Sequence, residues 1–554
     1  MQVKQRLDAL TSLRFIAAAM VVIAHADHIF GSFGIAAAAN MGQGVSFFFV
    51  LSGFILTWNY PVLVNWVDRR KFWLARFARI WPLHLVTCLL WIALIFNFDR
   101  AAHFPGFGGL VMLIANLLLL QVWVPLHDWG LSFNGVAWSI STELFFYAMF
   151  PLLIALWQKR WHQLLLVQAL VILLVIALTT FYAIPGKDDY PKIGLQGLIY
   201  FNPLVRIFEF SIGIALAVLV RKIATTGLQL GGLQWLALEL AALLALVVVM
   251  LAAENLSRTI QTIIGAPAAY YFERDGLWLF WAFLIGVFAL SHGPLTRFLS
   301  LRFAVFLGEI SFALYLCHAL VIHYLDGYIE QIQPYGSFGY VVFWFWCLSL
   351  SAILFFGVET PFRKFILAAV ARKEVVASLR ACFRAKEVAA LALLLGMVAA
   401  MFFLKPSTIE KLDQARVATF MQPSSESMSI PGGVKFGNRY EIVALRVHTE
   451  DSETVLVQVL LRSIQELLAD DVLALHINDK SGQIIANSDR RLNFGRVTIP
   501  AGTYWVQKFQ IRKALIDQGS SLGLAMYNMP SSLFDGVGGN RDWGGKRLIL
   551  PLNH

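Results

Sequence analysis

The sequence predicts an α-helical polytopic membrane bundle followed by a small all-β, sandwich-like domain. Hydrophobic residues make up 58% of the 554 residues and charged residues only 14%, so the chain cannot form one soluble core of ordinary composition. Many of its apolar runs are also about 20 residues long, which is the length that a helix needs to cross a bilayer. Short alternating apolar runs near the C-terminal end predict the β domain.

The expected bundle has about 11 transmembrane helices. They are expected at residues 12–31, 43–62, 80–98, 135–157, 162–184, 201–220, 231–252, 276–291, 304–326, 337–357 and 388–404. A shorter run at 108–124 is expected to be a re-entrant or interfacial helix, because the basic loops before and after it then lie on the same side of the membrane. Lys and Arg gather in the loops that this topology places in the cytoplasm with the N-terminus.

Four segments follow from this pattern. Residues 1–365 form the main membrane domain, 366–404 a basic cytoplasmic segment and the last transmembrane helix, 405–439 a polar linker, and 440–554 an extracytoplasmic β-rich domain. Turn signals such as Asp479-Lys480-Ser481-Gly482 separate the expected strands.

Charge and cysteine usage exclude several classes of protein. The net charge of +10 would suggest nucleic acid in a soluble protein, but here the cations lie in loops that orient membrane helices. No nucleic-acid partner is therefore expected. The four cysteines stand apart without a CxxC spacing, so neither a metal site nor a disulfide framework is expected.

The first expected helix carries Arg14 and His25 on nearly the same face, about 16 Å apart along the axis. An imidazole in an apolar span is costly unless it faces a cavity or a partner, which favours a functional role. Arg14 is expected at the cytoplasmic end and His25 in the outer half. The alternatives are structural roles. Arg14 could anchor the helix by extending its side chain to the membrane surface, and His25 could be a structural histidine whose hydrogen bonds are satisfied within the protein.

A basic segment follows the second expected helix and contains Arg69, Arg76 and Arg79, of which the last two share a helical face. Guanidinium groups gathered at the cytoplasmic mouth can bind phosphates in a bidentate manner. The alternative is that these arginines only set the topology.

Further charged groups lie within later apolar runs. Glu143 is expected at the outer end of its helix, and His318, like His25, in the outer half of its own. A carboxylate near an imidazole orients it and raises its basicity, although Glu143 alone could equally be half of a buried ion pair. Arg206 and Glu209 most simply neutralise each other.

Taken in order, these motifs resemble the acyltransferase-3 family over about residues 8–365. The resemblance also includes Ser52-Gly53-Phe54, the segment from Trp138 to Tyr147 and the closing Glu359-Thr360-Pro361. The resemblance implies a membrane-embedded O-acyltransferase. Such an enzyme takes an acyl group, commonly acetyl, from cytoplasmic acyl-coenzyme A and delivers it to a hydroxyl of an envelope polysaccharide, lipid or peptidoglycan.

The resemblance maps the family's histidine to His25, its arginine to Arg14, and its basic-loop arginines to Arg76 and Arg79. We therefore expect these arginines, with Arg69, to bind the donor, and His25, Glu143 and His318 to carry the chemistry. His25 would act either as the general base or as an acyl carrier. No metal and no permanently bound cofactor is expected.

The expected partners are acyl-coenzyme A, an envelope polysaccharide or glycolipid acceptor, and the lipid of a bacterial inner membrane. Some family members complete the transfer with a C-terminal serine-hydrolase-like domain, but no Gly-Asp-Ser block follows residue 405 here. The β domain is therefore expected to bind the acceptor or an envelope-biosynthesis partner. The competing interpretations are a multi-pass transporter, because buried charges also line transport pathways, and a scaffold that presents the β domain.

Overall fold

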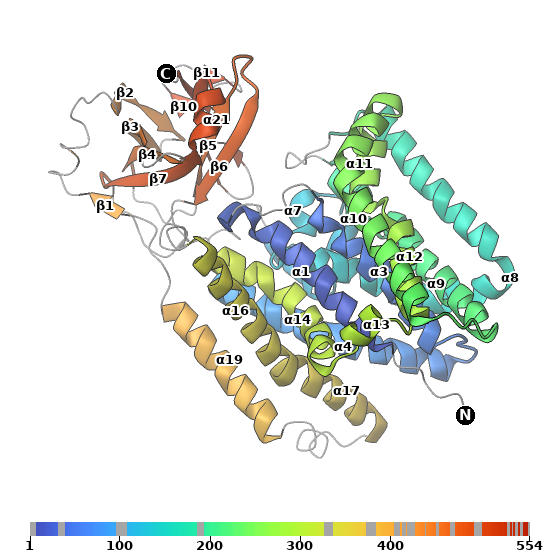
Figure 1. The fold of residues 1–554 in the computed structure, drawn as a ribbon. Coiled ribbons are helices and arrows are strands. Elements are labelled where there is room, and N and C mark those ends of the chain that lie inside the picture. Colours follow the sequence, from blue (N-terminus) through green and yellow to red (C-terminus); the bar gives the residue numbers. More distant parts are fainter. Residues whose placement is uncertain are drawn as a thin grey trace. The chain divides into compact units, whose positions relative to one another are not determined.

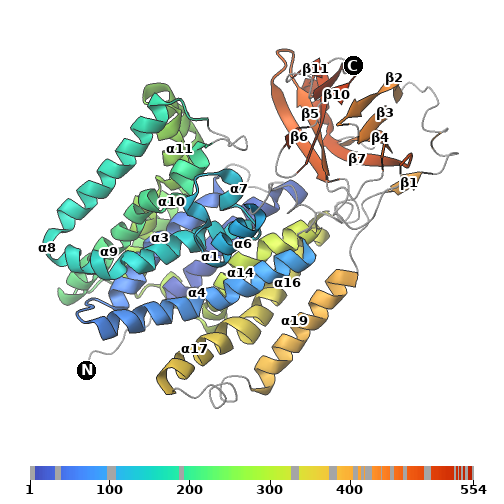
Figure 2. The same cartoon turned by 180° about the vertical axis from the view of Figure 1, so that it is seen from behind.

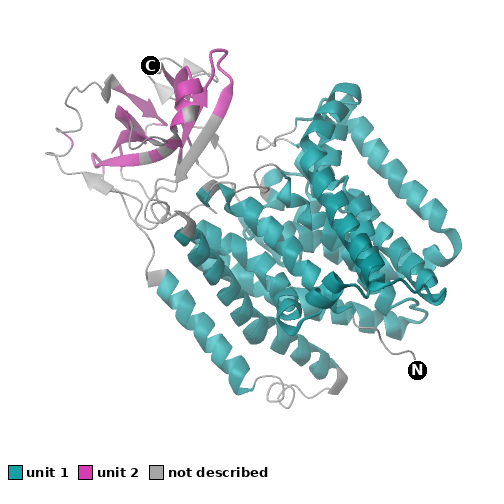
Figure 3. Ribbon diagram, in the orientation of Figure 1, with its two compact units in different colours: residues 1–96, 105–403 teal, residues 97–104, 404–554 magenta. Residues whose placement is uncertain are grey.

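The computed structural model describes most of the chain in two compact units (Figure 3). The first unit comprises residues 1–96 and 105–403, and the second comprises residues 97–104 and 404–554. The described residues are 7–30, 39–95, 108–185, 193–325, 336–372, 384–403, 410–412, 417, 427–437, 439–449, 454–465, 471–491, 501–528, 532–533, 536–537, 541–542 and 547–551.

The first unit is a bundle of helices (Figure 1). They are α1 (Asp8–Phe30), α3 (Gly44–Asn59), α4 (Trp66–Leu94), α6 (Gly108–Leu117), α7 (His127–Gly130), α8 (Trp138–Phe181), α9 (Pro203–Thr225), α10 (Gly232–Ile263), α11 (Ala266–Asp275), α12 (Trp278–Leu290), α13 (Pro294–Leu299), α14 (Arg302–Leu325), α16 (Gly336–Leu354), α17 (Thr360–Arg372) and α19 (Ala385–Phe403). Within the described residues, eight segments are long and apolar enough to cross a membrane. The chain is a multi-pass membrane protein.

The predicted number of eleven crossings is not confirmed, although each expected span coincides with a helix. The spans expected at 135–157 and 162–184 lie in one element, α8, which a kink at Arg160 (φ −144°, ψ 35°) divides in two. Helix α12 has 13 residues and is thus about 20 Å long, which is shorter than the hydrocarbon core of about 30 Å.

The segment expected to be re-entrant or interfacial contains the ten-residue helix α6, which lies beside α4 (Figure 2). Carbonyl groups at and just after its end accept hydrogen bonds from side chains of α4 and α8. These side chains are Trp81, His84 and Ser141. Backbone groups at membrane depth need such protein cover, so these contacts satisfy the physical requirement on which the prediction rested.

Close contact between α1 and α14 sets the level of the two predicted histidines. Gly308 of α14 lies so near α1 that a Cβ atom there would be 2.0 Å from the carbonyl oxygen of Thr11. Thr11 precedes His25 on α1, and Gly308 precedes His318 on α14. The two helices therefore run parallel, and their histidines meet further along.

Glycines also allow α3 and α9 to touch. A Cβ atom on Gly53 would lie 1.9 Å from the carbonyl oxygen of Phe210, and one on Gly213 would lie 2.0 Å from that of Val50. Gly53 belongs to the Ser-Gly-Phe motif, so one role of this motif is the close approach of the two backbones.

The second unit contains two antiparallel sheets. The strand order in the first is β1 (Glu410–Leu412), β7 (Tyr504–Arg512), β4 (Thr454–Ser463), β3 (Tyr440–Thr449), β2 (Ser427–Phe436) and β10 (Gly536–Val537). The order in the second is β11 (Arg541–Asp542), β12 (Arg547–Pro551), β8 (Ser521–Asn528), β5 (Asp471–Asn478) and β6 (Ile484–Arg491), with β9 (Ser532–Leu533) beside β8. Buried side chains of both sheets, such as Trp505 and Leu524, share one core, as the two-layer prediction requires.

Two details of this unit refine the prediction. Strands β1 and β2 lie within 405–439, so this segment is not only the polar linker that was expected. The expected turn after β5 is confirmed. Asp479 Oδ1 accepts hydrogen bonds from the backbone of Ser481 and Gln483, and Gly482 takes the left-handed φ of 82° that favours glycine.

Candidate active site

Two histidines from different helices meet inside the bundle. Nδ1 of His25 on α1 lies 2.8 Å from Nε2 of His318 on α14, and the two rings are parallel to within 8°. His318 is completely buried, whereas His25 is exposed on the bundle. The pair therefore joins a sequestered ring to one that can meet an incoming molecule.

The second nitrogen of His318 determines where the protons lie in this pair. Nδ1 of His318 is 3.2 Å from the carbonyl oxygen of Leu314, which can only accept a hydrogen bond. In the neutral ring Nδ1 therefore carries the proton, and Nε2 accepts one from Nδ1 of His25. This arrangement places the basic lone pair of neutral His25 on Nε2.

Tyr315 supports this pair from within α14. Its ring centroid lies 5.9 Å from that of His318, and its hydroxyl contacts Ser139 Oγ at 2.8 Å and the Val136 carbonyl at 3.2 Å. Both partners belong to the segment where α8 begins. The start of α8 is thereby fixed against the turn of α14 that precedes His318.

Glu143 is engaged by other groups. Its Oε1 accepts hydrogen bonds from Ser52 Oγ at 2.9 Å and from the Tyr147 hydroxyl at 2.6 Å. We expected Glu143 to orient His25, but in the described contacts His318 is the residue that holds Nδ1 of His25. The hydroxyl of Ser52 gives the Ser-Gly-Phe motif a polar role beside the packing role of Gly53.

Arg14 and Arg79 belong to a second group of charges. Nη1 of Arg79 lies 3.8 Å from Oε1 of Glu359, whose side chain is 1% exposed. The strongest charged neighbours of Arg14 are Arg79, Glu359 and Glu143. The Oε2 atom of Glu359 has no hydrogen-bond partner among the described residues. The buried carboxylate of Glu359 therefore pairs with Arg79 and also has an electrostatic influence on Arg14.

Arg76 lies against aromatic rings. Its guanidinium carbon is 5.8 Å from the ring centroid of Tyr60 and 6.0 Å from those of Phe72 and Tyr147. These distances fit cation–π contacts, and Nε of Arg76 is buried without a hydrogen-bond partner in the described structure. Cation–π contacts position the guanidinium group of Arg76 without occupying its N–H donors, which can still bind an anion.

Not every predicted arginine joins this group, and one further arginine does. Nε of Arg69 donates to the Leu63 carbonyl at 3.4 Å, just ahead of its own helix. Arg363 of α17 instead has Arg79, Glu359 and Arg76 as its strongest charged neighbours. We call Arg14, Arg76, Arg79 and Arg363 the arginine cluster. The signal for Arg363 was its position four residues after Glu359, one helical turn away.

Glu143 is linked to the arginine cluster through Tyr147, which donates to its Oε1 and whose ring lies 6.0 Å from the guanidinium carbon of Arg76. It is within electrostatic reach of Arg14 and of Tyr315, which neighbours His318. The described contacts thus join His25 to His318, and Glu143 through Tyr147 to Arg76. No group of described residues could hold a metal ion.

Comparison with known proteins identifies the chain. The model of the acyltransferase domain family matches residues 7–360. The protein belongs to this acyltransferase family. The matched region includes the histidine pair, Glu143 and every member of the arginine cluster except Arg363, and it excludes the β domain.

Three curated relatives show how far the similarity reaches. Acyltransferase MdmB of Streptomyces mycarofaciens is 33% identical over 336 residues, which cover 58% of this chain and 80% of that protein. O-acetyltransferase OatA of Staphylococcus aureus is 24% identical over 377 residues, covering 65% and 57%. Putative peptidoglycan O-acetyltransferase YrhL of Bacillus subtilis is 27% identical over 192 residues, covering 31% and 28%. No solved structure matches.

Proposed function

We propose that this acyltransferase moves an acyl group, expected to be acetyl, from cytoplasmic acyl-coenzyme A to a hydroxyl of an extracytoplasmic polysaccharide or other envelope glycan. The observation that carries the proposal is the histidine pair, because Nε2 of His25 is the basic atom that transfer to a hydroxyl requires. The names of OatA and YrhL, an O-acetyltransferase and a putative peptidoglycan O-acetyltransferase, support the acetyl group and the glycan acceptor.

In the direct route His25 is the general base. Its Nε2 takes the proton of the acceptor hydroxyl while the hydroxyl oxygen attacks the thioester carbonyl. The new C–O bond forms, the C–S bond breaks, and the proton passes from Nε2 to the departing sulfur. The imidazolium formed in between keeps its Nδ1–H bond to His318, which strengthens as the ring becomes charged.

In the alternative route Nε2 itself attacks the thioester carbonyl. The acyl group is then carried on the imidazole and coenzyme A leaves as the thiolate. In a second step the acceptor oxygen attacks the acyl carbon, the bond to Nε2 breaks to restore neutral His25, and the hydroxyl proton passes to the thiolate. Both routes need the same tautomer of His25, so His318 acts in each as a positioning residue.

The arginine cluster is proposed to bind the phosphates of the donor. Its guanidinium groups outnumber the carboxylate of Glu359, and a phosphate can form bidentate, charge-assisted hydrogen bonds with them. Arg14 lies about 16 Å before His25 along α1. The flexible arm of coenzyme A that carries the thioester would cover this distance. Arg69 would add positive charge at the entrance.

The proposed location is a bacterial inner membrane, with the N-terminus in the cytoplasm and the β domain outside. This orientation follows from the distribution of Lys and Arg among the expected loops. The arginine cluster would then face the cytoplasmic donor, and the histidine pair would lie nearer the acceptor. The β domain would bind the acceptor or another protein of envelope biosynthesis.

The deciding experiment supplies membranes containing the full-length protein with acetyl-coenzyme A labelled in the acetyl group. We expect label to become covalently attached to envelope glycan, and His25→Ala to lower the rate by at least about a hundredfold. His162, which is exposed on α8, provides the matched control, and His162→Ala should retain the rate. Equal labelling by His25→Ala and the wild type in equally folded samples would refute the proposal. Uptake of label without covalent attachment would favour a transporter.

A further inference from the structure

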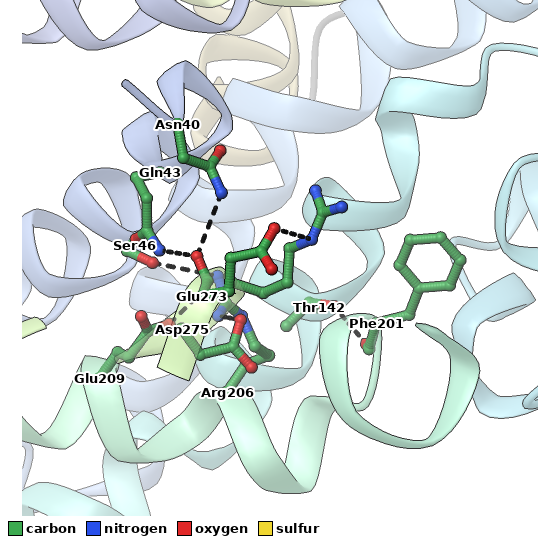
Figure 4. Close-up of polar contacts among 10 residues, drawn as sticks. Asn40, Gln43, Ser46, Thr142, Phe201, Arg206, Glu209, Glu273 and Asp275 are labelled. Carbon is green, nitrogen blue, oxygen red and sulfur yellow. Dashed lines mark hydrogen bonds and ion pairs between the residues drawn. The ribbon is translucent and has the colours of Figure 1, made fainter. Parts of the chain in front are cut away.

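A second buried group of charges lies outside the machinery described above (Figure 4). Arg206 of α9 forms an ion pair through Nη1 with Asp275, the last residue of α11. Its Nη2 lies 3.3 Å from Oε2 of Glu209 and donates to Ser46 Oγ of α3 at 3.5 Å. All three charged side chains are at most 2% exposed.

Several hydrogen-bond donor and acceptor atoms in this group have no partner within the group. Oε1 of Glu209, Oδ2 of Asp275 and Nε of Arg206 have no hydrogen-bond partner among the described residues, whereas Oε2 of Glu209 is engaged by its ion pair with Arg206. One guanidinium also faces two carboxylates, so the expected mutual neutralisation of Arg206 and Glu209 accounts for only part of the charge. Unsatisfied buried polar atoms are uncommon and are retained where a further molecule or a function requires them.

The rim of the group is aromatic and partly open. The guanidinium carbon of Arg274, a side chain that is 39% exposed, lies 5.7 Å from the ring centroids of both Tyr200 and Tyr270. The ring of Tyr200 also lies 5.5 Å from the guanidinium carbon of Arg206. Both tyrosines are half-buried. Partly exposed side chains, those of Arg274 and the two tyrosines, thus adjoin Arg206 through Tyr200, and the carboxylate partners of Arg206 are buried.

The segment that carries this rim is fixed from a second side. Side-chain amides of Asn40 and Gln43 donate to the carbonyl oxygen of Glu273, next to Arg274 (Figure 4). The end of α11 is therefore held both by these amides and by the Arg206–Asp275 ion pair. Rigid placement of this kind suits a recognition site.

The group is also close to the histidine pair. Tyr200 and Arg206 are both among the electrostatic neighbours of Tyr315. The ring of Tyr315 lies 5.9 Å from that of His318. The start of α8 links the two places through contacts, because the Trp138 ring lies 4.5 Å from that of Tyr200 and the adjacent Ser139 hydroxyl contacts the Tyr315 hydroxyl at 2.8 Å.

We propose that Arg206, Glu209 and Asp275, with Tyr200, Tyr270 and Arg274 at the rim, form the acceptor subsite and bind a hydroxyl-rich molecule such as a sugar. Sugar hydroxyls donate to the unsatisfied carboxylate oxygens and accept from Nε of Arg206, while an apolar sugar face stacks on a tyrosine ring. An acyl chain could not form hydrogen bonds with these polar atoms, because a hydrocarbon chain has no hydrogen-bond donors or acceptors. The inference rests on the proposed function in one respect, that the bound molecule carries the hydroxyl to be acylated.

The test measures sugar binding to the full-length protein in detergent, without acyl-coenzyme A. The probes are methyl glucoside, methyl galactoside and N-acetylglucosamine. We expect the wild type to bind at least one of them, and Glu209→Gln and Asp275→Asn to weaken that binding by about tenfold or more. Tyr270→Ala, a change at the half-buried rim, should also weaken sugar binding. This variant tests the proposal even if the buried variants do not fold.

Glu239 on α10 provides a matched control. It is completely buried like Glu209, but its carboxylate accepts hydrogen bonds from Ser291, Leu295 and Thr296. Glu239→Gln should therefore bind the probe like the wild type. The proposal is overturned if the wild type binds none of the probes, or if all folded variants bind equally. Coenzyme A binding by the same samples tests the donor side separately, so its absence would count against the proposed function and not against a sugar subsite.

Discussion

Nε2 of His318 lies 2.8 Å from Nδ1 of His25, while Nδ1 of His318 faces the carbonyl oxygen of Leu314 at 3.2 Å. The Leu314 carbonyl is thus the fixed end of a chain of hydrogen bonds that includes the exposed ring of His25. The carbonyl cannot give up a proton, so it holds the tautomer of both neutral rings. In the proposed mechanism, the buried His318 takes the position behind His25 that a carboxylate takes behind a catalytic histidine.

Two substitutions of His318 should distinguish a role in orienting His25 from a role in packing the bundle. His318→Ala is expected to lower kcat for acetyl transfer by about a hundredfold with little change in the KM for acyl-coenzyme A, because Nδ1 of His25 loses its acceptor. His318→Gln should recover part of the loss, since its amide oxygen can accept the same hydrogen bond. The measurement is steady-state transfer in membranes with equal amounts of folded protein. Equal rates for the two variants would show that His318 only fills space.

Donor binding should distinguish Arg79 from Arg69. Arg79 belongs to the arginine cluster and pairs with Glu359, whereas the described hydrogen bond of Arg69 is to the nearby Leu63 carbonyl. Arg79→Ala is expected to raise the KM for acetyl-coenzyme A by about ten- to a hundredfold, which corresponds to one lost hydrogen bond to a charged group. Arg69→Ala should raise it less. An equal effect of the two variants would contradict the assignment of the phosphate site to the cluster.

Much of the fold could be predicted because the length of an apolar run reports directly on a membrane helix. What could not be predicted was the number of separate helices, since the pattern does not distinguish a kink at Arg160 from a complete turn between two spans. The pairing of α1 with α14 was equally hidden. It depends on a glycine contact between Gly308 and Thr11, far apart in the chain.

The site residues were recognisable one by one because each is a polar group in an apolar run. Their partners were not. Glu143 was expected to orient His25 because it lies at a similar depth and a carboxylate commonly orients an imidazole, whereas its described hydrogen bonds come from Ser52 and from Tyr147, four residues later. Asp275 was missed as a partner of Arg206 because it lies just outside an expected span, where a charge usually faces water.

Gly308 gives a test of the helix contact that brings the histidines together. In Gly308→Ala the new Cβ would meet the Thr11 carbonyl, so α14 must move away from α1, at a cost of about 1–3 kcal/mol in the free energy of unfolding. We expect a lower melting temperature and a loss of acetyl transfer. Gly396→Ala is the control, because nothing lies within 4 Å of a Cβ at that position. Similar melting curves for both variants would disprove the close contact.

Removal of residues 406–554 tests the division of labour between the two units. All members of the histidine pair and the arginine cluster lie in the first unit, whose core clusters are separate from the β core. We therefore expect the shortened chain to insert in the membrane and to bind coenzyme A with the affinity of the full chain, as measured by equilibrium dialysis in detergent. Acetyl transfer to the envelope glycan should fall, because the β domain is proposed to bind the acceptor or a partner protein. Retained transfer at the full rate would remove that role, and loss of coenzyme A binding by a folded bundle would mean that the donor site needs the second unit.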